Sequence, residues 1–178
     1  MSIHGVTFDY QSPTAKDHGR LFQGILEDGV LKGCAISFTG TEVTIGTGYM
    51  IVAGRLLQVT AAETITINSS DAYARIMVQV DLSGTATTEE FAQVEVLADY
   101  ASSLNGFSSP TQEDVNATGT VYQFEFAKLK LTSGNVTAIS WQAPESEVCA
   151  PSRVKIGDTV YTLRTGSSGA AGYITIVT

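Results

Sequence analysis

The chain has 178 residues, a formal charge of −8 and an isoelectric point near 4.6, which allows one domain with a small appendage. Its ten basic residues are scattered, which argues against nucleic acid and against an anionic membrane surface as partners. No apolar run is long enough to span a bilayer, and no signal peptide opens the sequence, so we expect a protein made in the cytoplasm.

A helix is predicted near the N-terminus, over Pro13–Glu27. Ser12 precedes a proline at the first helical position, and Gly29 stands where a terminating glycine is common. Apolar residues recur at helical spacing, and we expect them to be buried against a sheet or a partner. These are Phe22, Ile25 and Leu26.

Beyond Gly29 the hydrophobic period changes to two, which is typical of β-strands. The central segment is Val43–Val59, in which the apolar run Tyr49–Ala53 predicts a strand covered on both faces, in the middle of a sheet. Gly54 is expected to form a bulge or a tight bend. Further strands are predicted at Cys34–Phe38, Glu63–Ile67, Tyr73–Leu82, Val121–Leu131 and Val136–Trp141.

Two later segments are less regular. The alternation in Phe91–Tyr100 favours a strand over a helix. Residues Ala101–Thr120 form a polar loop, within which Ser109–Glu113 has the cap, proline and early acid of a short helix.

The predicted architecture is a mainly β protein, an antiparallel sandwich or barrel-like domain with one N-terminal helix. This domain spans residues 1–142, and a linker at 143–151 leads to a small β meander at 152–178. A meander of this size is not stable alone, so we expect it to be an interface element. Its last strand is apolar on both faces and includes Tyr173, Ile174 and Ile176.

Residues that could carry chemistry are sparse. His4 and His18 lie far apart, and Cys34 and Cys149 are isolated, whereas zinc needs ligands at close spacing. No phosphate-binding loop with its lysine and no nucleophile elbow occurs. We therefore expect a protein that is not an enzyme and has no cofactor or metal. The two cysteines are expected to be buried thiols, although a disulfide between them stays open.

Arg55 is an unusual residue in the most apolar part of the sequence. It could pair with a buried carboxylate, or it could emerge at the rim of the sheet and contact a partner, which is the favoured interpretation. The interface candidates are Phe22, Arg55, Tyr173, Ile174 and Ile176.

Several runs resemble tail and baseplate proteins of phages and prophages of Gram-positive bacteria. They are Thr14–His18 with Leu21-Phe22, Asp28–Cys34, Gly48–Arg55, Ala74–Leu82, and Pro110–Asp114 with Tyr122-Gln123. In order they cover roughly residues 12–140, and they resemble the amino-terminal domains of upper-baseplate or receptor-binding tail proteins.

This resemblance implies a non-enzymatic virion component. Such an adaptor attaches to the tail hub and carries receptor-binding parts, through which a host cell-surface saccharide would be reached. The sequence has no heptad stalk, so attachment rather than adhesion is the expected role. Phage tails are built on closed symmetry, and we expect a homo-oligomer, a trimer first, or else a monomer that assembles only on its ring partner.

Two other functions stay open. A carbohydrate- or receptor-binding module would need an exposed aromatic platform, for which Tyr100, Phe107 and Trp141 are the candidates. An unrecognised hydrolase would need a pocket with convergent polar residues.

Overall fold

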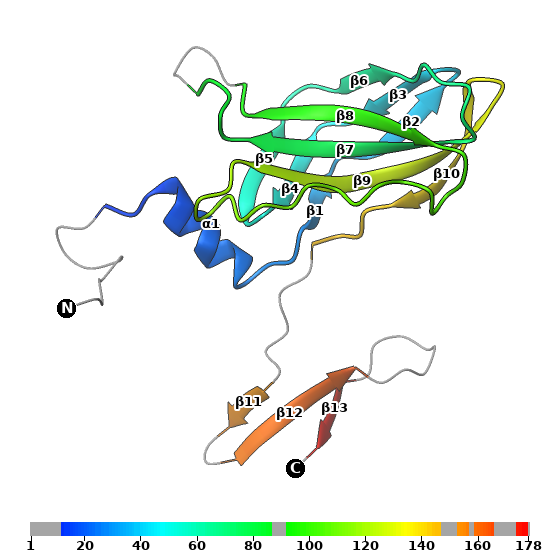
Figure 1. Ribbon diagram of the computed structural model, residues 1–178. Helices are drawn as coiled ribbons and strands as arrows, with labels where there is room; N and C mark the ends of the chain where they lie inside the picture. The colour runs from blue at the N-terminus through cyan, green and yellow to red at the C-terminus, as the bar shows by residue number, and fades with distance from the viewer. Residues whose placement is uncertain (1–11, 87–91, 147–152, 157–158, 166–173, 178) are drawn as a thin grey trace. The chain divides into compact units, whose positions relative to one another are not determined.

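The computed structural model describes residues 12–86, 92–146, 153–156, 159–165 and 174–177, and the last three ranges are described by their backbone alone. The chain divides into two units, Met1–Glu147 and Val148–Thr178. The described residues form antiparallel sheets and one short helix, so the predicted mainly β fold is confirmed (Figure 1).

The first layer of the larger unit is a meander of three long strands, each of which is interrupted at a bend and so divided into two β-strands. Its six strands are β1 (Gly29–Gly33), β2 (Ile36–Thr39), β3 (Glu42–Ile45), β4 (Gly48–Val52), β5 (Arg55–Val59) and β6 (Glu63–Thr66). They form the sheets β1-β4-β5 and β2-β3-β6. The two sheets continue into each other, since the amide of Cys34 bonds to Thr47 at 3.0 Å and that of Gly46 to Ala35 at 2.8 Å.

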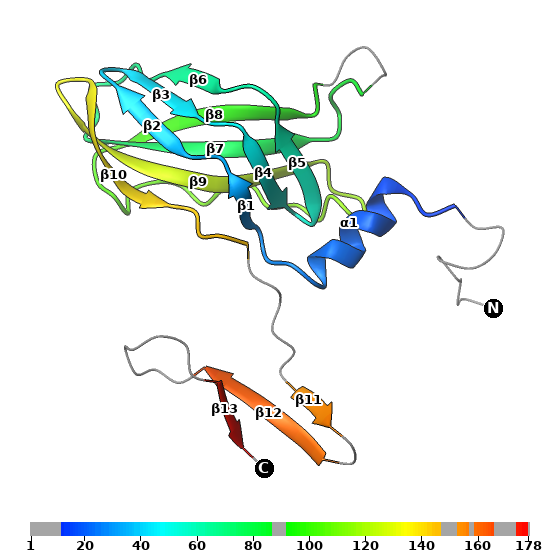
Figure 2. The ribbon, with the colours of Figure 1, turned by 180° about the vertical axis from the view of Figure 1, so that it is seen from behind.

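The second layer is a four-stranded antiparallel sheet in the order β10-β9-β7-β8. Its strands are β7 (Tyr73–Asp81), β8 (Val94–Ala101), β9 (Val121–Thr132) and β10 (Asn135–Gln142). Figures 1 and 2 show this sheet lying across the bent meander, which is the arrangement of a β sandwich. The segment predicted to be strand rather than helix is therefore strand, as β8.

The hydrophobic core fills the space between the layers. The alternating residues of β7 and β9 face inward, among them Ile76, Phe126 and Leu129, which are fully buried. From the meander come Val43, Met50 and Val52.

The run Tyr49–Ala53 is a central strand, as predicted. β4 lies between β1 and β5, and residues 50–53 are all buried, whereas Tyr49 is 39% exposed. Gly54 lies in the two-residue turn between β4 and β5, so it forms a tight bend and not a bulge. Ala53 and Gly54 both have positive φ, +51° and +71°, as the primed turns of β-hairpins require.

The β9–β10 turn gives a matched control for Gly54. Both Gly54 and Gly134 have positive φ, but a Cβ on Gly54 would lie 2.1 Å from the carbonyl oxygen of Gly19, whereas one on Gly134 would meet only Ser69 at 3.6 Å. We expect Gly134→Ala to cost about 1–2 kcal/mol of backbone strain. Gly54→Ala should cost at least about 1 kcal/mol more through overpacking. Chemical denaturation checks this, and equal losses would contradict it.

The helix α1 is shorter than predicted and spans Ala15–Gln23. Thr14 caps it rather than Ser12, because Thr14 and Asp17 form a reciprocal capping box. It ends at Gly24 rather than Gly29, since the Gly24 amide closes the last turn on the carbonyls of residues 20–22. The residues that follow it lead directly into β1.

The predicted short helix at Ser109–Glu113 is wrong. Residues 111–113 are extended and pair with the start of β9, where the amide of Gln123 bonds to Thr111 at 2.7 Å and that of Glu113 to Val121 at 3.1 Å. These bonds satisfy the backbone of the loop and of β9 together, which a single helical turn would not.

The smaller unit is the predicted meander, with β11 (Arg153–Ile156), β12 (Thr159–Thr165) and β13 (Ile174–Val177) paired antiparallel in that order. The first residues of the predicted linker belong instead to the larger unit. Ala143 is buried, and the amide of Val30 bonds to Pro144 at 3.1 Å while that of Ser146 bonds to Val30 at 2.8 Å. Residues 143–146 thus extend β10 along the edge of β1.

Candidate functional site

The helix α1 presents large apolar side chains to solvent. Leu21 is 55% exposed, Phe22 40%, and Ile25, one turn further on, 43%. The expectation that Phe22 and Ile25 are buried against the sheet is therefore wrong, although the alternative of burial against a partner stays open. Leu26 is half-buried. We call Leu21, Phe22 and Ile25 the α1 apolar face.

Polar contacts hold α1 in place without using this face. The guanidinium of Arg20 makes two bonds to the Asp114 carboxylate, at 2.9 and 2.7 Å, and the Lys16 ammonium donates to the carbonyl of Ala117. Asp114 has a lowered pKa, chiefly because Arg20 donates to its carboxylate. The helix is thus tied to the loop that precedes β9.

A close backbone approach fixes the other side of α1. Gly19 is the buried residue of the helix. A Cβ atom at this position would lie only 2.2 Å from the side chain of Asn116, so there is no room for a larger residue. The Asn116 amide in turn donates to the carbonyl of Ala53 at 2.7 Å and to Gln23 at 3.2 Å. The helix therefore lies against the β4–β5 turn through glycine and amide groups, which leaves its apolar residues free for another surface.

Arg55 forms no ion pair with a carboxylate among the described residues, and its contact with a partner stays a prediction. Its side chain is half-buried, and Nη2 donates to the carbonyl of Val115 at 3.0 Å, so it holds the same loop that α1 contacts. Burial lowers the pKa of this guanidinium. Its Nε is buried without a hydrogen-bond partner among the residues that the structure describes. Arg55 thus stabilises the loop around Val115, which α1 contacts.

Asp28 stabilises the β4–β5 turn, against which α1 lies. Its carboxylate accepts the amide of Ala53 at 2.7 Å, and Gly54 and the Tyr122 hydroxyl also donate to it. These bonds hold the strained turn on which α1 rests. Burial nevertheless raises the pKa of Asp28, since it outweighs the three hydrogen bonds that act in the opposite direction.

This shift predicts how stability depends on pH. Because the folded pKa of Asp28 lies above its unfolded value, the folded state loses stability as pH rises from about 4, the unfolded pKa, through the folded pKa. Asp28→Asn keeps an acceptor oxygen and cannot ionise. We expect its unfolding free energy to improve relative to wild type as pH rises over that range. A difference in unfolding free energy between Asp28→Asn and wild type that is constant with pH would contradict this. Asp28→Ala removes the acceptor altogether and should lower the unfolding free energy by about 1–3 kcal/mol.

A second surface lies on the outer face of the four-stranded sheet. Arg75 is 2% exposed there and bonds to the carboxylates of Asp99, with Nε at 2.9 Å, and Glu125. Burial acts to lower the pKa of Arg75, and these two carboxylates outweigh it and raise the pKa. Phe107 covers the guanidinium, whose central carbon is 5.0 Å from the ring centroid.

Two of the three aromatic candidates meet on this surface. Lys128 lies between them, with Nζ 5.7 Å from the centroid of Phe107 and 5.9 Å from that of Trp141. Trp141 is 40% exposed. Tyr100 belongs elsewhere, since it packs against the core and its hydroxyl accepts the amide of Asn68 at 3.2 Å.

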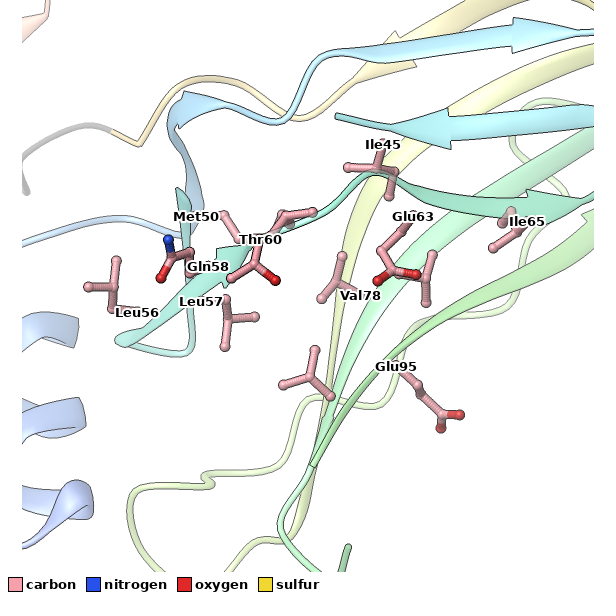
Figure 3. A pocket seen from close by; sticks show the side chains of 13 residues that line it. Ile45, Met50, Leu56, Leu57, Gln58, Thr60, Glu63, Ile65, Val78 and Glu95 are labelled. Atoms are coloured by element: carbon pink, nitrogen blue, oxygen red, sulfur yellow. The ribbon is translucent and has the colours of Figure 1, made fainter. Parts of the chain in front are cut away.

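A groove of about 620 Å³ runs along one side of the sandwich and was not predicted (Figure 3). Residues of β5 and β6 line one side of it and residues of β8 line the other. The sequence does show the alternating valines of β8, but it does not show that this strand faces β5. The lining residues are Ile45, Met50, Leu56, Leu57, Gln58, Val59, Thr60, Glu63, Ile65, Val78, Val94, Glu95 and Val96.

The remaining interface candidates belong to the smaller unit. Tyr173 lies outside the described residues, and Ile174 and Ile176 lie in β13, of which the backbone alone is described. Of the two cysteines, Cys34 is a buried free thiol, with a pKa that burial raises, and Cys149 lies outside the described residues.

In the part of the chain that the structure describes, no cluster of three or more His, Cys, Asp or Glu side chains could hold a metal ion. No helix among these residues is long and apolar enough to cross a membrane. The chain matches no protein-family model, and a search of curated proteins gave no significant match.

Proposed function

We propose that this protein is a non-enzymatic structural component of a phage or prophage tail or baseplate, an adaptor that attaches to the tail hub through the α1 apolar face. The observation that carries the attachment is that Leu21 and Phe22 on α1, and Ile25 just after its end, are exposed although the helix is already held by polar contacts. Exposed apolar side chains grouped on one element commonly mark a protein interface. The virion context rests on the resemblance of residues 12–140 to tail proteins.

Binding is assigned to α1 because the contacts of this helix with its own domain leave its apolar side chains uncovered. An amphipathic helix normally buries its apolar residues on its own domain. Here the domain side of the helix is Gly19, with Lys16 and Arg20 reaching the loop beside it, so hydrophobic burial contributes little to docking α1. A partner that covers Leu21, Phe22 and Ile25 would supply that burial, at about 25 cal/mol per Å² of apolar surface.

Binding to the hub or distal-tail ring protein from the same genome tests this proposal. The purified chain is titrated with that protein, and affinity is measured by calorimetry for wild type and for Leu21→Ser/Phe22→Ser. The control is Phe38→Ser, which changes a residue of similar exposure, 36%, on β2, at the far end of the sandwich from α1 (Figure 1). We expect the α1 variant to bind at least tenfold more weakly and the control to bind as wild type.

Equal binding of all three proteins would reject the α1 apolar face, and no binding of wild type to any tail protein would reject the adaptor role. Light scattering on the same samples tests the expected homo-oligomer, for which a trimer is the first expectation. A monodisperse monomer that also fails to bind the ring protein would count against it.

A carbohydrate-binding role remains a second candidate because Phe107 and Trp141 flank Lys128 on an accessible surface. Aromatic rings beside a cation can stack on a sugar while the ammonium bonds to its hydroxyls or acidic groups. Trp141 is the only tryptophan in the sequence, so its fluorescence reports on this surface alone. A saturable change on titration with cell-wall saccharide, absent in Phe107→Ala, would favour this role over attachment alone.

A further inference from the structure

The β sandwich is closed along one side and open along the other. On the closed side, residues 143–146 extend β10 and bridge to β1, with Val30 paired in parallel to Glu145. On the open side, β8 is the edge of the four-stranded sheet, and β5 and β6 are the edges of the meander. Within the described residues no strand pairs with the outer edges of these three strands. The groove therefore lies between two free strand edges (Figure 3).

The core is incompletely covered along this groove. Its floor is buried and consists of Ile45, Met50 and Val78, which are at most 2% exposed. Several residues along its sides pack on the core and yet remain partly exposed, and they come from both layers. They are Leu57, Val59, Ile65, Val94 and Val96. An apolar strip of this kind would be covered by alternate side chains of one added strand.

The edge of β8 lacks the features that usually prevent strand addition. Its sequence, Val94–Ala101, contains no Lys, Pro or Gly, and it pairs with β7 over its whole length without a bulge. Its two acidic side chains are engaged with β7, Glu95 with Gln79 at 2.7 Å and Asp99 with Arg75. A regular, unprotected edge of this length offers backbone donors and acceptors to another strand.

The charge of the groove indicates which strand it suits. Its lining includes the exposed carboxylate of Glu63 and no Lys or Arg, while the carboxylate of Glu95 is directed to the outer face of the sheet, where it accepts from Gln79 (Figure 3). The whole chain has a formal charge of −8, so a second copy would bring further negative charge. A strand with Lys or Arg complements the carboxylate of Glu63, and the overall negative charge disfavours the close approach of a second copy of the chain.

We propose that the groove accepts one extended β-strand from a partner protein, with apolar residues at alternate positions and Lys or Arg near its ends. The strand pairs with β8 and places its apolar side chains between Val96 and Leu57, which closes the sandwich. This site is separate from the α1 apolar face and does not depend on the chain being a virion component. Its failure in the test below would therefore leave the proposed function untouched.

A labelled peptide tests the proposal on the full-length protein. The probe has about seven residues, the length of an ordinary strand, with alternating Val and Thr and a Lys at each end. A second peptide has Pro in place of the central Thr, which removes a backbone donor and disfavours strand pairing. Fluorescence anisotropy measures binding, and hydrogen exchange with and without peptide locates it.

We expect the alternating peptide to bind saturably, at least tenfold more tightly than the Pro peptide, and to slow amide exchange in β8. Val96→Lys should weaken binding at least tenfold. Ser140→Lys, which adds the same charge on the edge strand β10 outside the groove, should not. Circular dichroism checks that both variants are folded, and the Pro peptide decides the question if Val96→Lys is not.

Three results would overturn the proposal. One is equal affinity for the two peptides, and another is binding that leaves β8 exchange unchanged. The third is a wild-type protein that is dimeric without peptide and becomes monomeric in Val96→Lys, because the groove would then be occupied by a second copy of this chain.

Discussion

We expect Phe126→Ala to lower the unfolding free energy by about 3–5 kcal/mol, the usual cost of removing a fully buried aromatic ring. Phe126 is 0% exposed and lies at the centre of β9, where it packs between the two layers. Phe22→Ala removes the same side chain from α1, where the ring is 40% exposed and the helix is held by other contacts. It should cost less than about 1 kcal/mol.

Chemical denaturation of both variants measures this difference, and the comparison distinguishes a core residue from an interface residue. Phe22→Ala should keep the denaturant slope of wild type, because no core surface is exposed. If Phe22→Ala were as destabilising as Phe126→Ala, the ring of Phe22 would belong to the core of the domain, and α1 would not be an attachment surface.

The second large effect concerns the buried guanidinium of Arg75. Removing both of its partners with Asp99→Asn/Glu125→Gln should cost about 3–5 kcal/mol, since a charge that is 2% exposed would lose its counter-charges. Arg75→Met should be milder, because it removes the buried charge and leaves two carboxylates that are 32% and 25% exposed and can be hydrated.

The control for this network is the exposed ion pair between Arg20 and Asp114, whose side chains are 51% and 50% exposed. Asp114→Asn should change stability far less than the double variant, as solvent screens exposed pairs. Thermal unfolding at one pH and salt concentration ranks the variants. A double variant that is as stable as Asp114→Asn would show that Arg75 reaches solvent when its partners are neutral.

The central strand of the meander could be predicted from the sequence for a physical reason. Residues 50–53 are buried on both faces of the sheet. Such burial needs apolar residues at consecutive positions, and a continuous apolar run with glycines at its ends is a local pattern that the sequence shows directly. The strand β8 was predictable because its alternation agrees with its single partly covered face.

Features that depend on distant residues could not be predicted in this way. The segment 109–113 has helical start signals, but pairing with β9, ten residues later, overrides them. The apolar spacing of Phe22 and Ile25 does not reveal that Gly19, Asn116 and Gly54 hold the helix with these side chains outward. The groove lies between β5 and β8, which are more than thirty residues apart in the sequence, so no local pattern predicts it.

The most direct test of the attachment proposal is an image of the intact phage particle, at a resolution that places individual chains. We expect this chain at the tail tip, with Leu21, Phe22 and Ile25 covered by the hub or distal-tail ring protein. A particle that lacks the chain, or one in which the chain is present and these three side chains face solvent, would contradict it.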